Sequence, residues 1–314
     1  MPEAQTQSKF NFETYLASRR RLVEERLEQY LAGGEPSVLF ESMRYSVLSG
    51  GKRLRAVLVI AAAEAVAAKQ QHSQSSQAIE KVLPCACAIE MVHAMSLIHD
   101  DLPALDNDDL RRGKATNHKV FGEAMALLAG DGLLMLANEV LIAHTKDVAA
   151  AHLLDVTLEL SRATGPLGMV GGQVKDMEFT GSADHIDVDT VASIHAAKTG
   201  ALIRFALWSG GRLMGGSDKQ LESLYRLGEI LGLAFQIQDD LLDVTGDAKT
   251  LGKTPGKDQA SKKATWVAAI GIDGARKKLA ELEAEGRQLI TASLDNPNSP
   301  ALLCLLEYSI HREK

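Results

Sequence analysis

The sequence predicts an all-α protein, built as one helical bundle around a central apolar cavity. Hydrophobic residues make up 46% of the chain, aromatic residues only 4%, and only 8 of the 314 residues are proline. Apolar residues recur at the spacing of amphipathic helices, and no segment shows convincing two-residue alternation. Because no Pro- and Ser-rich linker separates two cores, residues 1–314 are predicted to form a single domain.

Glycine, proline and polar runs mark where the predicted helices end. Gly33, Gly34 and Pro36 end the first helix, and Gly50 and Gly51 close the second, because both residue types disfavour helix interiors. The expected helices cover residues 13–31, 40–48, 54–68, 78–101, 123–144, 149–164, 190–213, 219–245, 264–293 and 301–311. Polar, glycine-rich or connecting segments are expected at 69–77, 115–120, 165–172, 181–189 and 248–263, and residues 1–9 are expected to be disordered.

The helix at 78–101 is expected to lie in the centre of the bundle. Residues 54–68 are rich in Ala, Val and Leu, and residues 78–101 are apolar almost throughout. A helix that is hydrophobic on all sides is normally buried. Residues 123–144 are expected to form another apolar helix.

The composition restricts partners and compartment. A formal net charge of −7 argues against a nucleic-acid surface. Cys85, Cys87 and Cys304 give no disulfide framework and are expected as free thiols. We find no uncharged run of about twenty apolar residues and no secretory leader. The chain is therefore predicted to be cytoplasmic without stable membrane insertion, and a removed transit peptide stays open.

The stretch 96–113, SLIHDDLPALDNDDLRRG, is densely acidic. Its five carboxylates and the two arginines that follow them are Asp100, Asp101, Asp106, Asp108, Asp109, Arg111 and Arg112. Carboxylates this dense repel each other and call for a counter-cation, and hard oxygen ligands favour magnesium or calcium. The adjacent arginines suit a phosphate that the metal also touches. Taken alone, the stretch could equally be a solvated acidic loop.

A second acidic cluster, FQIQDDLLD at 235–243, favours a binding site over a solvated acidic loop. Asp239 and Asp243 are four residues apart and so share one face of a helix, whereas Asp240 points about 100° away. In the first stretch, Pro103 must break the helix, so that Asp106 can fold back. The two clusters at the ends of long apolar helices predict a site for a substrate with a diphosphate head and a hydrocarbon tail.

Cationic and polar residues elsewhere could complete such a site. GGKRLR places Lys52, Arg53 and Arg55 beside glycines at a helix start, which suits a phosphate. His93 lies two turns before Asp100 on the same face. Each of these features also has a purely structural explanation. Basic residues at helix starts are usually solvated, and a lone histidine on an apolar helix is usually a core residue.

These segments together resemble the trans-prenyltransferases, the head-to-tail isoprenyl diphosphate synthases. The match runs from about Tyr45 to the C-terminus and includes GGKRLR, DDLPALDNDDLRRG, GGQVKDME, AAKTGAL, FQIQDDLLD and LGKTPGKD. The variant of the first acidic motif is similar to that of plant and cyanobacterial geranylgeranyl diphosphate synthases. The resemblance implies the all-α isoprenoid synthase fold, a homodimer, and three magnesium ions between the two acidic clusters. One departure is Ala56, where the family usually has proline.

The resemblance also assigns roles by position. It makes Asp100, Asp106 and Asp239 the main magnesium ligands, with Asp101, Asp240 and Asp243 in support. It implies an isopentenyl diphosphate site formed by Lys52, Arg55, His93 and Arg112. It implies an allylic diphosphate site formed by Arg111, Lys198, Thr199, Gln236, Lys253 and Lys263. The implied reaction adds isopentenyl diphosphate to dimethylallyl, geranyl or farnesyl diphosphate after magnesium-assisted ionisation of the allylic substrate.

Product length is expected to depend on the helix before Asp100. Met95 and Ser96 lie roughly 6–7.5 Å down the helix from it, and Val92 and Met91 lie deeper. In the family that this chain resembles, a bulky aromatic residue at these positions commonly stops growth at fifteen carbons. None is present, so the expected product is geranylgeranyl diphosphate, with farnesyl diphosphate as the alternative.

Other functions remain open at this point. A terpene cyclase shares the helical cavity and the first acidic motif, but it would need no second diphosphate site such as GGKRLR and His93. A catalytically silent subunit of a heteromeric synthase is a further alternative, although both acidic clusters are intact. A plain helical scaffold would require the paired clusters to be a coincidence.

Overall fold

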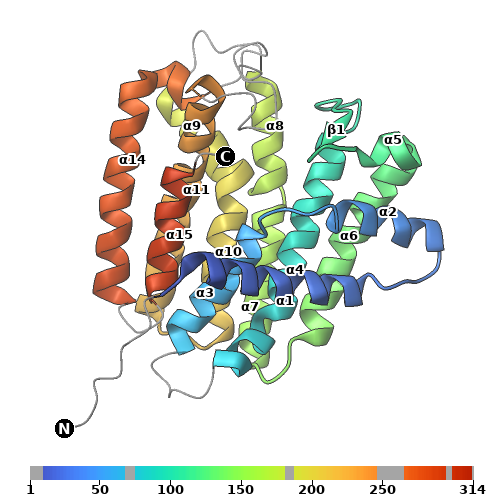
Figure 1. The fold of residues 1–314 in the computed structure, drawn as a ribbon, viewed down its shortest axis with the longest axis horizontal. Helices are drawn as coiled ribbons and strands as arrows, with labels where there is room; N and C mark the ends of the chain where they lie inside the picture. The colour runs from blue at the N-terminus through green and yellow to red at the C-terminus, as the bar shows by residue number, and fades with distance from the viewer. Residues whose placement is uncertain (1–9, 68–74, 181–186, 246–264, 295–298, 313–314) are drawn as a thin grey trace.

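The protein is a bundle of helices arranged side by side, with no larger sheet among the residues described (Figure 1). The computed structural model describes residues 10–67, 75–180, 187–245, 265–294 and 299–312. The α-helices are α1 (Phe12–Tyr30), α2 (Ser37–Val47), α3 (Leu54–Ala67), α4 (Ser75–Asp100), α5 (Asn117–Phe121), α6 (Glu123–His144), α7 (Ala150–Thr164), α8 (Met169–Phe179), α9 (Val188–His195), α10 (Ala201–Leu213), α11 (Asp218–Thr245), α14 (Trp266–Ser293) and α15 (Ser299–His311). The predicted all-α class is confirmed.

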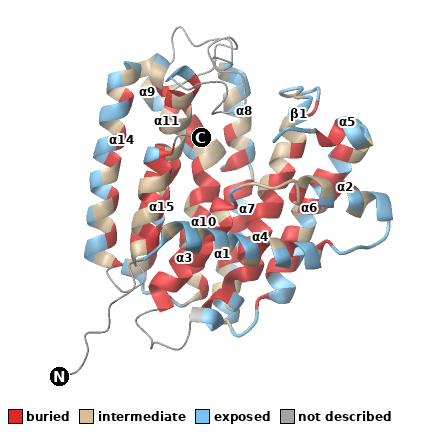
Figure 2. Cartoon of the chain, in the orientation of Figure 1, coloured by how far each residue is buried: buried red, intermediate tan, exposed pale blue. Residues whose placement is uncertain are grey.

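The most buried helices lie in the middle of the bundle. Helices α6, α4, α3, α10, α11 and α14 each pack extensively on the next, and buried residues concentrate on α3, α4 and α10 (Figure 2). Every residue of α3 except Arg55 is buried. The buried apolar residues form one connected core from α1 to α15. Helix α4, which was expected to be central from its apolar sequence, is therefore central, and the structure shows that α3 is buried as well.

One predicted helix, residues 190–213, is divided by a π-helical segment. The chain runs from α9 through the π-helix Ala196–Gly200 into α10. The wider π turn lies against α8, where a Cβ on Gly172 would come within 2.2 Å of the Lys198 backbone nitrogen. Such π turns are frequently found at functional sites. The glycine allows α8 to approach the segment that carries Lys198.

Three elements were not predicted. Helix α8 was missed because Gly168, Gly171 and Gly172 lower helix propensity at its start, and α5 lies within what was expected to be a connector. The expectation of no strands was wrong for one short antiparallel hairpin, β1 (Leu110–Arg111) with β2 (Lys114–Ala115). Two-residue strands are too short to show an alternating pattern.

Two helices, α4 and α6, are long and apolar enough to cross a membrane by length and composition. In α4 this reflects its place in the core, since 78% of its most apolar window is buried, against 39% for α6. Helix α6 therefore presents an apolar face on the outside of the bundle. The absence of membrane insertion stays a prediction from the sequence.

Candidate active site

The chain folds back on itself directly after α4, as Pro103 predicts. The backbone N–H of Asp106 donates a hydrogen bond to the carbonyl of Asp100 at 2.8 Å. This bond spans six residues and closes a tight loop at the end of the helix. The two predicted metal ligands of the first acidic cluster, six apart in sequence, are thereby brought to the same end of α4.

A tight turn separates the two arginines of the first motif. Arg112 and Gly113 both have positive φ, 55° and 77°, as a type I′ hairpin turn requires. Arg111 consequently donates to both carboxylate oxygens of Asp101, from Nε at 2.8 and 2.9 Å. Arg112 points the other way and donates to Ser49 Oγ at 3.2 Å and to the Gly50 carbonyl. The turn thus directs one arginine to the acidic cluster and the other to the GGKRLR loop.

Burial changes the electrostatics of the first cluster. Burial raises the pKa of Asp100 to about 6, with Lys198 acting against this and Asp106 adding to it. Burial also raises the pKa of Asp101, and the hydrogen bonds from Arg111 oppose this increase. Carboxylates crowded together in this way are stabilised by a cation at the same place.

A cavity of about 300 Å³ opens beside Asp100. Its polar lining includes Arg55, His93, Asp100, Lys198 and Thr199, all of them predicted site residues. Its apolar lining comes from α4, α8, α10 and the loop after α4, and comprises Met95, Leu97, Leu105, Met169, Val170, Val174 and Leu202. The structure therefore brings ligands of both predicted diphosphate sites to one apolar cavity.

Lys198 is held in this cavity by a partner that the sequence interpretation missed. Its Nζ lies 2.6 Å from Asp176 Oδ2, and Asp176 belongs to α8, the helix that was not predicted. Asp176 is four residues after Gly172, so it lies on the face of α8 that approaches the π-helix. The GGQVKDME motif contains Asp176, but no role could be assigned to it from sequence alone.

The second acidic cluster lies on α11, and its three aspartates have different environments. Asp239 is partly exposed and pairs with Arg312, whose Nη2 lies 2.7 Å from Asp239 Oδ1. Asp240 is buried and accepts a hydrogen bond from the backbone N–H of Trp266 at 2.7 Å. Asp243 is 2% exposed. Asp239 is therefore the member best placed to reach a ligand, while Asp240 positions the start of α14.

Arg312 is a residue that the sequence interpretation did not consider. Its guanidinium lies 3.5 Å from the centre of the Phe235 ring and donates to the Phe235 carbonyl at 2.8 Å. Gln238 in turn donates to the Arg312 carbonyl at 2.9 Å. The end of α15 is thus fastened to the helix that carries the second cluster. A lone arginine near the C-terminus gave no signal that could have revealed this.

Arg55 and His93 lie side by side in the polar lining of the cavity, and their buried position affects the charge of both. Burial lowers the pKa of the Arg55 guanidinium, and the nearby Glu90 and Asp239 carboxylates oppose that change. Burial, followed by the charges of Arg55 and Arg112, lowers the pKa of His93 well below its usual value. His93 is therefore neutral at pH 7 and offers one hydrogen-bond donor and one acceptor. Lys52 is exposed, with its Nζ 5.4 Å from the centre of the Tyr308 ring.

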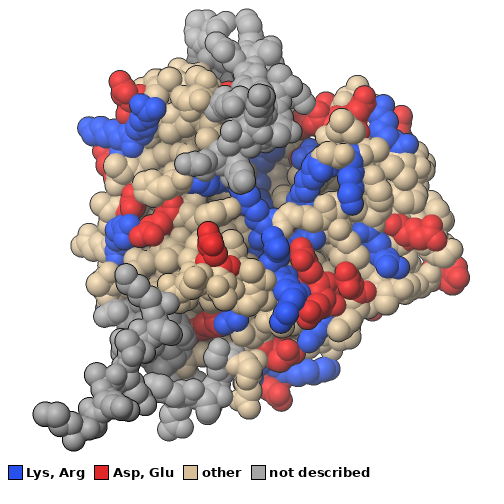
Figure 3. All heavy atoms as spheres, in the orientation of Figure 1, with Lys and Arg blue, Asp and Glu red and all other residues tan. Residues whose placement is uncertain are grey.

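Several predicted residues are not brought to this cavity. Met95 and Ser96 line it, whereas Met91 and Val92 are fully buried in the core and do not. Gln236 is half-buried on α11 and is not among the lining residues. Lys253 and Lys263 lie outside the described residues. Figure 3 shows Lys and Arg side chains in a column across the middle of the face of Figure 1, flanked by Asp and Glu.

The carboxylates present fit magnesium that is shared with a substrate. Among the described residues, no three His, Cys, Asp or Glu side chains are close enough to hold a metal ion by themselves. Magnesium is usually held by one or two carboxylates together with substrate phosphates and water. Asp100 and Asp106 on one side and Asp239 on the other offer this kind of incomplete, oxygen-only donor set.

Comparison with known proteins assigns the chain to a family. The family model described as polyprenyl synthetase matches residues 36–290. The chain belongs to the polyprenyl synthetase family. Its helical bundle resembles the crystal structure of a FPP/GFPP synthase from Zymomonas mobilis, with a TM-score of 0.80 and 31% identity over 96% of this chain and 99% of that one. The predicted family and fold are confirmed.

Three curated relatives of this polyprenyl synthetase match over nearly its full length. A dimethylallyltranstransferase from Fischerella ambigua (strain UTEX 1903) is 46% identical, covering 98% of this chain and 85% of the relative. The chloroplastic geranylgeranyl pyrophosphate synthase of Capsicum annuum is 41% identical, covering 99% and 81%. The farnesyl diphosphate synthase of Geobacillus stearothermophilus is 42% identical, covering 92% and 94%. All three are named as transferring or extending prenyl groups.

The buried His195, next to the π-helix, makes stability depend on pH. Burial lowers the pKa of His195 from 6.5 to about 4, so between these values the unfolded chain binds a proton that the folded chain does not. Stability is therefore lost as the pH falls through this range. Between pH 7 and pH 5, the free energy of unfolding of the wild type should therefore fall by about 2 kcal/mol more than that of His195→Gln. Urea unfolding of both proteins at both pH values measures this difference. Equal losses in both proteins would contradict this assignment.

Proposed function

We propose that this polyprenyl synthetase condenses isopentenyl diphosphate with allylic diphosphates and that its main product is geranylgeranyl diphosphate. The observation that supports it best is the cavity beside Asp100, which has Asp100, Lys198 and Arg55 at its polar side and methionine, leucine and valine along its wall. Such a cavity accepts a charged head and an apolar tail together. The direct test is incubation of the purified protein with magnesium, isopentenyl diphosphate and each allylic primer, followed by chromatography of the products.

The chain's residues hold the head groups and exclude water. Lys198, Thr199 and Arg111 bind the allylic diphosphate, and Lys52, Arg55, His93 and Arg112 bind isopentenyl diphosphate. Asp100, Asp106 and Asp239 would hold magnesium, expected as three ions, and the bound metal would supply Lewis acidity to stabilise the leaving diphosphate. The cationic side chains stabilise the same negative charge as it develops.

The proposed reaction needs no side-chain base. The allylic C–O bond breaks and its electron pair leaves with the diphosphate, which gives a carbocation. The double bond of isopentenyl diphosphate then forms the new C–C bond, and the released diphosphate accepts the proton that is lost. The apolar wall, with Met95, Leu202 and Val174, keeps out water that would otherwise trap the carbocation.

Both acidic clusters should be needed for magnesium-dependent activity. We expect Asp100→Asn and Asp239→Asn each to lower kcat/KM by on the order of 100-fold, as the loss of a group that stabilises the transition state commonly does. The concentration of magnesium that gives half-maximal activity should rise as well. Asp109→Asn is the control, since Asp109 is exposed and pairs only at the surface with Lys119 at 2.7 Å. Full activity of Asp239→Asn at the wild-type magnesium requirement would refute the assignment.

Two observations support a twenty-carbon product. The cavity wall below Asp100 is formed at Met95 and Ser96, where no aromatic ring limits the tail, and a geranylgeranyl pyrophosphate synthase is 41% identical over nearly the full chain. A farnesyl diphosphate synthase is equally similar over a somewhat shorter length. The fifteen-carbon product is therefore the second candidate, and the length of the main product decides between them.

A larger side chain at Met95 should shorten the product. Met95→Phe places a rigid ring in the wall of the cavity, so we expect the main product to change from twenty carbons to fifteen while total turnover stays within about tenfold. Chromatography of the dephosphorylated products measures the change. Met214→Phe is the control, because Met214 follows α10 and lies outside the cavity lining. An unchanged product distribution in Met95→Phe would overturn the role of this residue.

We also propose that the protein is a homodimer. Large apolar side chains are exposed on α6, on α7, in the loop after α7 and on α8, namely Leu128, Met135, Ile142, Leu154, Leu158, Leu167 and Met177. Met135 is 68% exposed and Leu154 is 69% exposed. Helix α7 packs against both α6 and α8, and exposed apolar side chains that gather on neighbouring helices usually mark a protein interface. A second copy of the chain offers the same surface, as a twofold dimer requires.

A charge in this surface should prevent dimer formation. Leu128, Met135 and Ile142 are spaced seven residues apart on one face of α6. Met135→Glu therefore places a carboxylate in the middle of the surface, and we expect a monomer at micromolar concentration where the wild type is a dimer. Sedimentation velocity measures this. Ile270→Glu, on the exposed side of α14, should leave the dimer intact, and a monomeric wild type would refute the proposal.

The remaining alternatives are separated by the same assays. A terpene cyclase would consume an allylic diphosphate without isopentenyl diphosphate, and a silent subunit would show no turnover alone. The cytoplasmic location stays a prediction from the sequence.

A further inference from the structure

Arg53, in the middle of GGKRLR, is buried, whereas Arg55 of the same motif lines the cavity. It is 5% exposed and has a positive φ of 51°, a backbone conformation that is uncommon for a residue other than glycine. Its carbonyl accepts the first hydrogen bond of α3, from Val57 N–H at 3.0 Å. Arg53 therefore occupies the N-cap position of α3, for which its side chain has no acceptor to offer.

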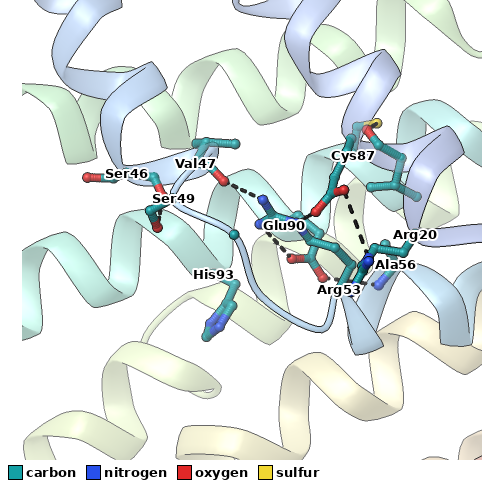
Figure 4. A network of polar contacts seen from close by, with 12 residues as sticks. Arg20, Ser46, Val47, Ser49, Arg53, Ala56, Cys87, Glu90 and His93 are labelled. Carbon is teal, nitrogen blue, oxygen red and sulfur yellow. Dashed lines mark hydrogen bonds and ion pairs between the residues drawn. The ribbon is translucent and has the colours of Figure 1, made fainter. Parts of the chain in front are cut away.

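A carboxylate from another helix supplies the missing acceptor. Glu90 of α4 is 3% exposed, and its Oε1 accepts from the backbone N–H of Ala56 at 3.2 Å (Figure 4). Ala56 is in the first turn of α3, where N–H groups have no partner within the helix. A negative charge at this position also interacts favourably with the helix dipole. Glu90 thus fixes where α3 begins relative to α4.

The Arg53 guanidinium connects the same point to two more helices. It donates to the Val47 carbonyl at the end of α2 at 2.6 Å and lies 3.6 Å from both the Glu90 and the Glu24 carboxylates. Glu24 belongs to α1, so one buried arginine connects α1, α2 and α4 to the start of α3. Leaving either charge buried without its partner costs several kcal/mol. The path of the GGKRLR loop is thereby strongly determined.

This network lies beside the predicted ligands of isopentenyl diphosphate. His93 is three residues after Glu90, one turn along α4 (Figure 4). Glu90, Arg53, His93 and Arg112 line one small cavity. Glu90 also favours the charged forms of Arg55 and Arg112, since its carboxylate opposes the lowering of the pKa of both. The Glu90 carboxylate therefore stabilises Arg55 and Arg112 as cations in the absence of an anionic substrate.

We propose that Glu90, acting through Arg53 and the start of α3, is a positioning residue for the isopentenyl diphosphate site. It sets the separation between the Lys52–Arg55 segment and His93 without touching substrate itself. This inference rests on the proposed function, because it concerns one of the two diphosphate sites.

The variant Glu90→Gln, which removes the charge, distinguishes two roles for Glu90. The residue could position the ligands of isopentenyl diphosphate, or its negative charge could simply repel the anionic substrate. Glutamine retains the volume and one acceptor for Ala56 N–H but loses the charge that holds Arg53. If Glu90 positions the cations, KM for isopentenyl diphosphate should rise about tenfold, a loss of about 1.4 kcal/mol, while KM for the allylic substrate stays within twofold. If Glu90 merely contributed negative potential near an anion, its removal would lower that KM instead. An unchanged or lower KM overturns the proposal.

A matched control exists in the same bundle. Glu64 on α3 is 4% exposed and pairs with Arg19 of α1 at 2.5 Å, so it is also a buried Glu–Arg pair between helices. Glu64→Gln should lower the thermal midpoint but leave both KM values unchanged. A selective rise in Glu90→Gln therefore could not be attributed to a general loss of stability.

A second variant keeps the proposal falsifiable if Glu90→Gln does not fold. Arg53→Lys retains the charge but cannot reach Val47, Glu24 and Glu90 together, so KM for isopentenyl diphosphate should rise three- to tenfold. An unchanged KM in a folded Arg53→Lys protein contradicts the proposal. In the double variant Arg53→Lys with Glu90→Gln, KM for isopentenyl diphosphate should rise by less than the product of the two single increases. Both substitutions break the same Arg53–Glu90 interaction, so their effects should not be independent. A wild type without condensation activity would instead refute the proposed function itself.

Discussion

Three charged residues of the predicted site are held by an opposite charge from another segment of the chain. Asp101 pairs with Arg111, Lys198 with Asp176, and Asp239 with Arg312. A buried charge without a partner is so unfavourable that these pairs determine how the helices that carry them can pack. The charged groups of the site thus help to specify the fold, while the fold arranges those groups around one cavity.

The same pairs explain how the site can exist before a substrate binds. Within the acidic clusters, Asp101 and Asp239 are each paired with an arginine, which reduces the repulsion from the neighbouring carboxylates. In the proposed function, a diphosphate bound together with a metal ion would carry both kinds of charge and could replace these partners. The pairs therefore keep the groups in place in a form that a charged substrate can exchange.

The apolar helices form the wall of the cavity next to these charged groups. Helix α4 is a core helix along most of its length and a part of the site at its end, so one segment supplies both the wall and the acids. Met95 faces the cavity while Met91 and Val92 face the core. On a helix, residues three or four apart share a face only approximately, so the sequence could place all three near Asp100 but could not say which of them faces the tail.

The sequence by itself determined the helical class, the two acidic clusters and the fold-back at Pro103, because these follow from local spacing and backbone restriction. The motifs also determined the family. Only the tertiary structure decided that Asp176, Arg312 and Glu90 belong to the site's surroundings, since each acts on a residue 22, 73 or 34 positions away. A contact between distant residues depends on how helices pack, and no local pattern records it. Likewise, helix α8 follows from close packing that its glycines permit, whereas their intrinsic propensity argues against a helix.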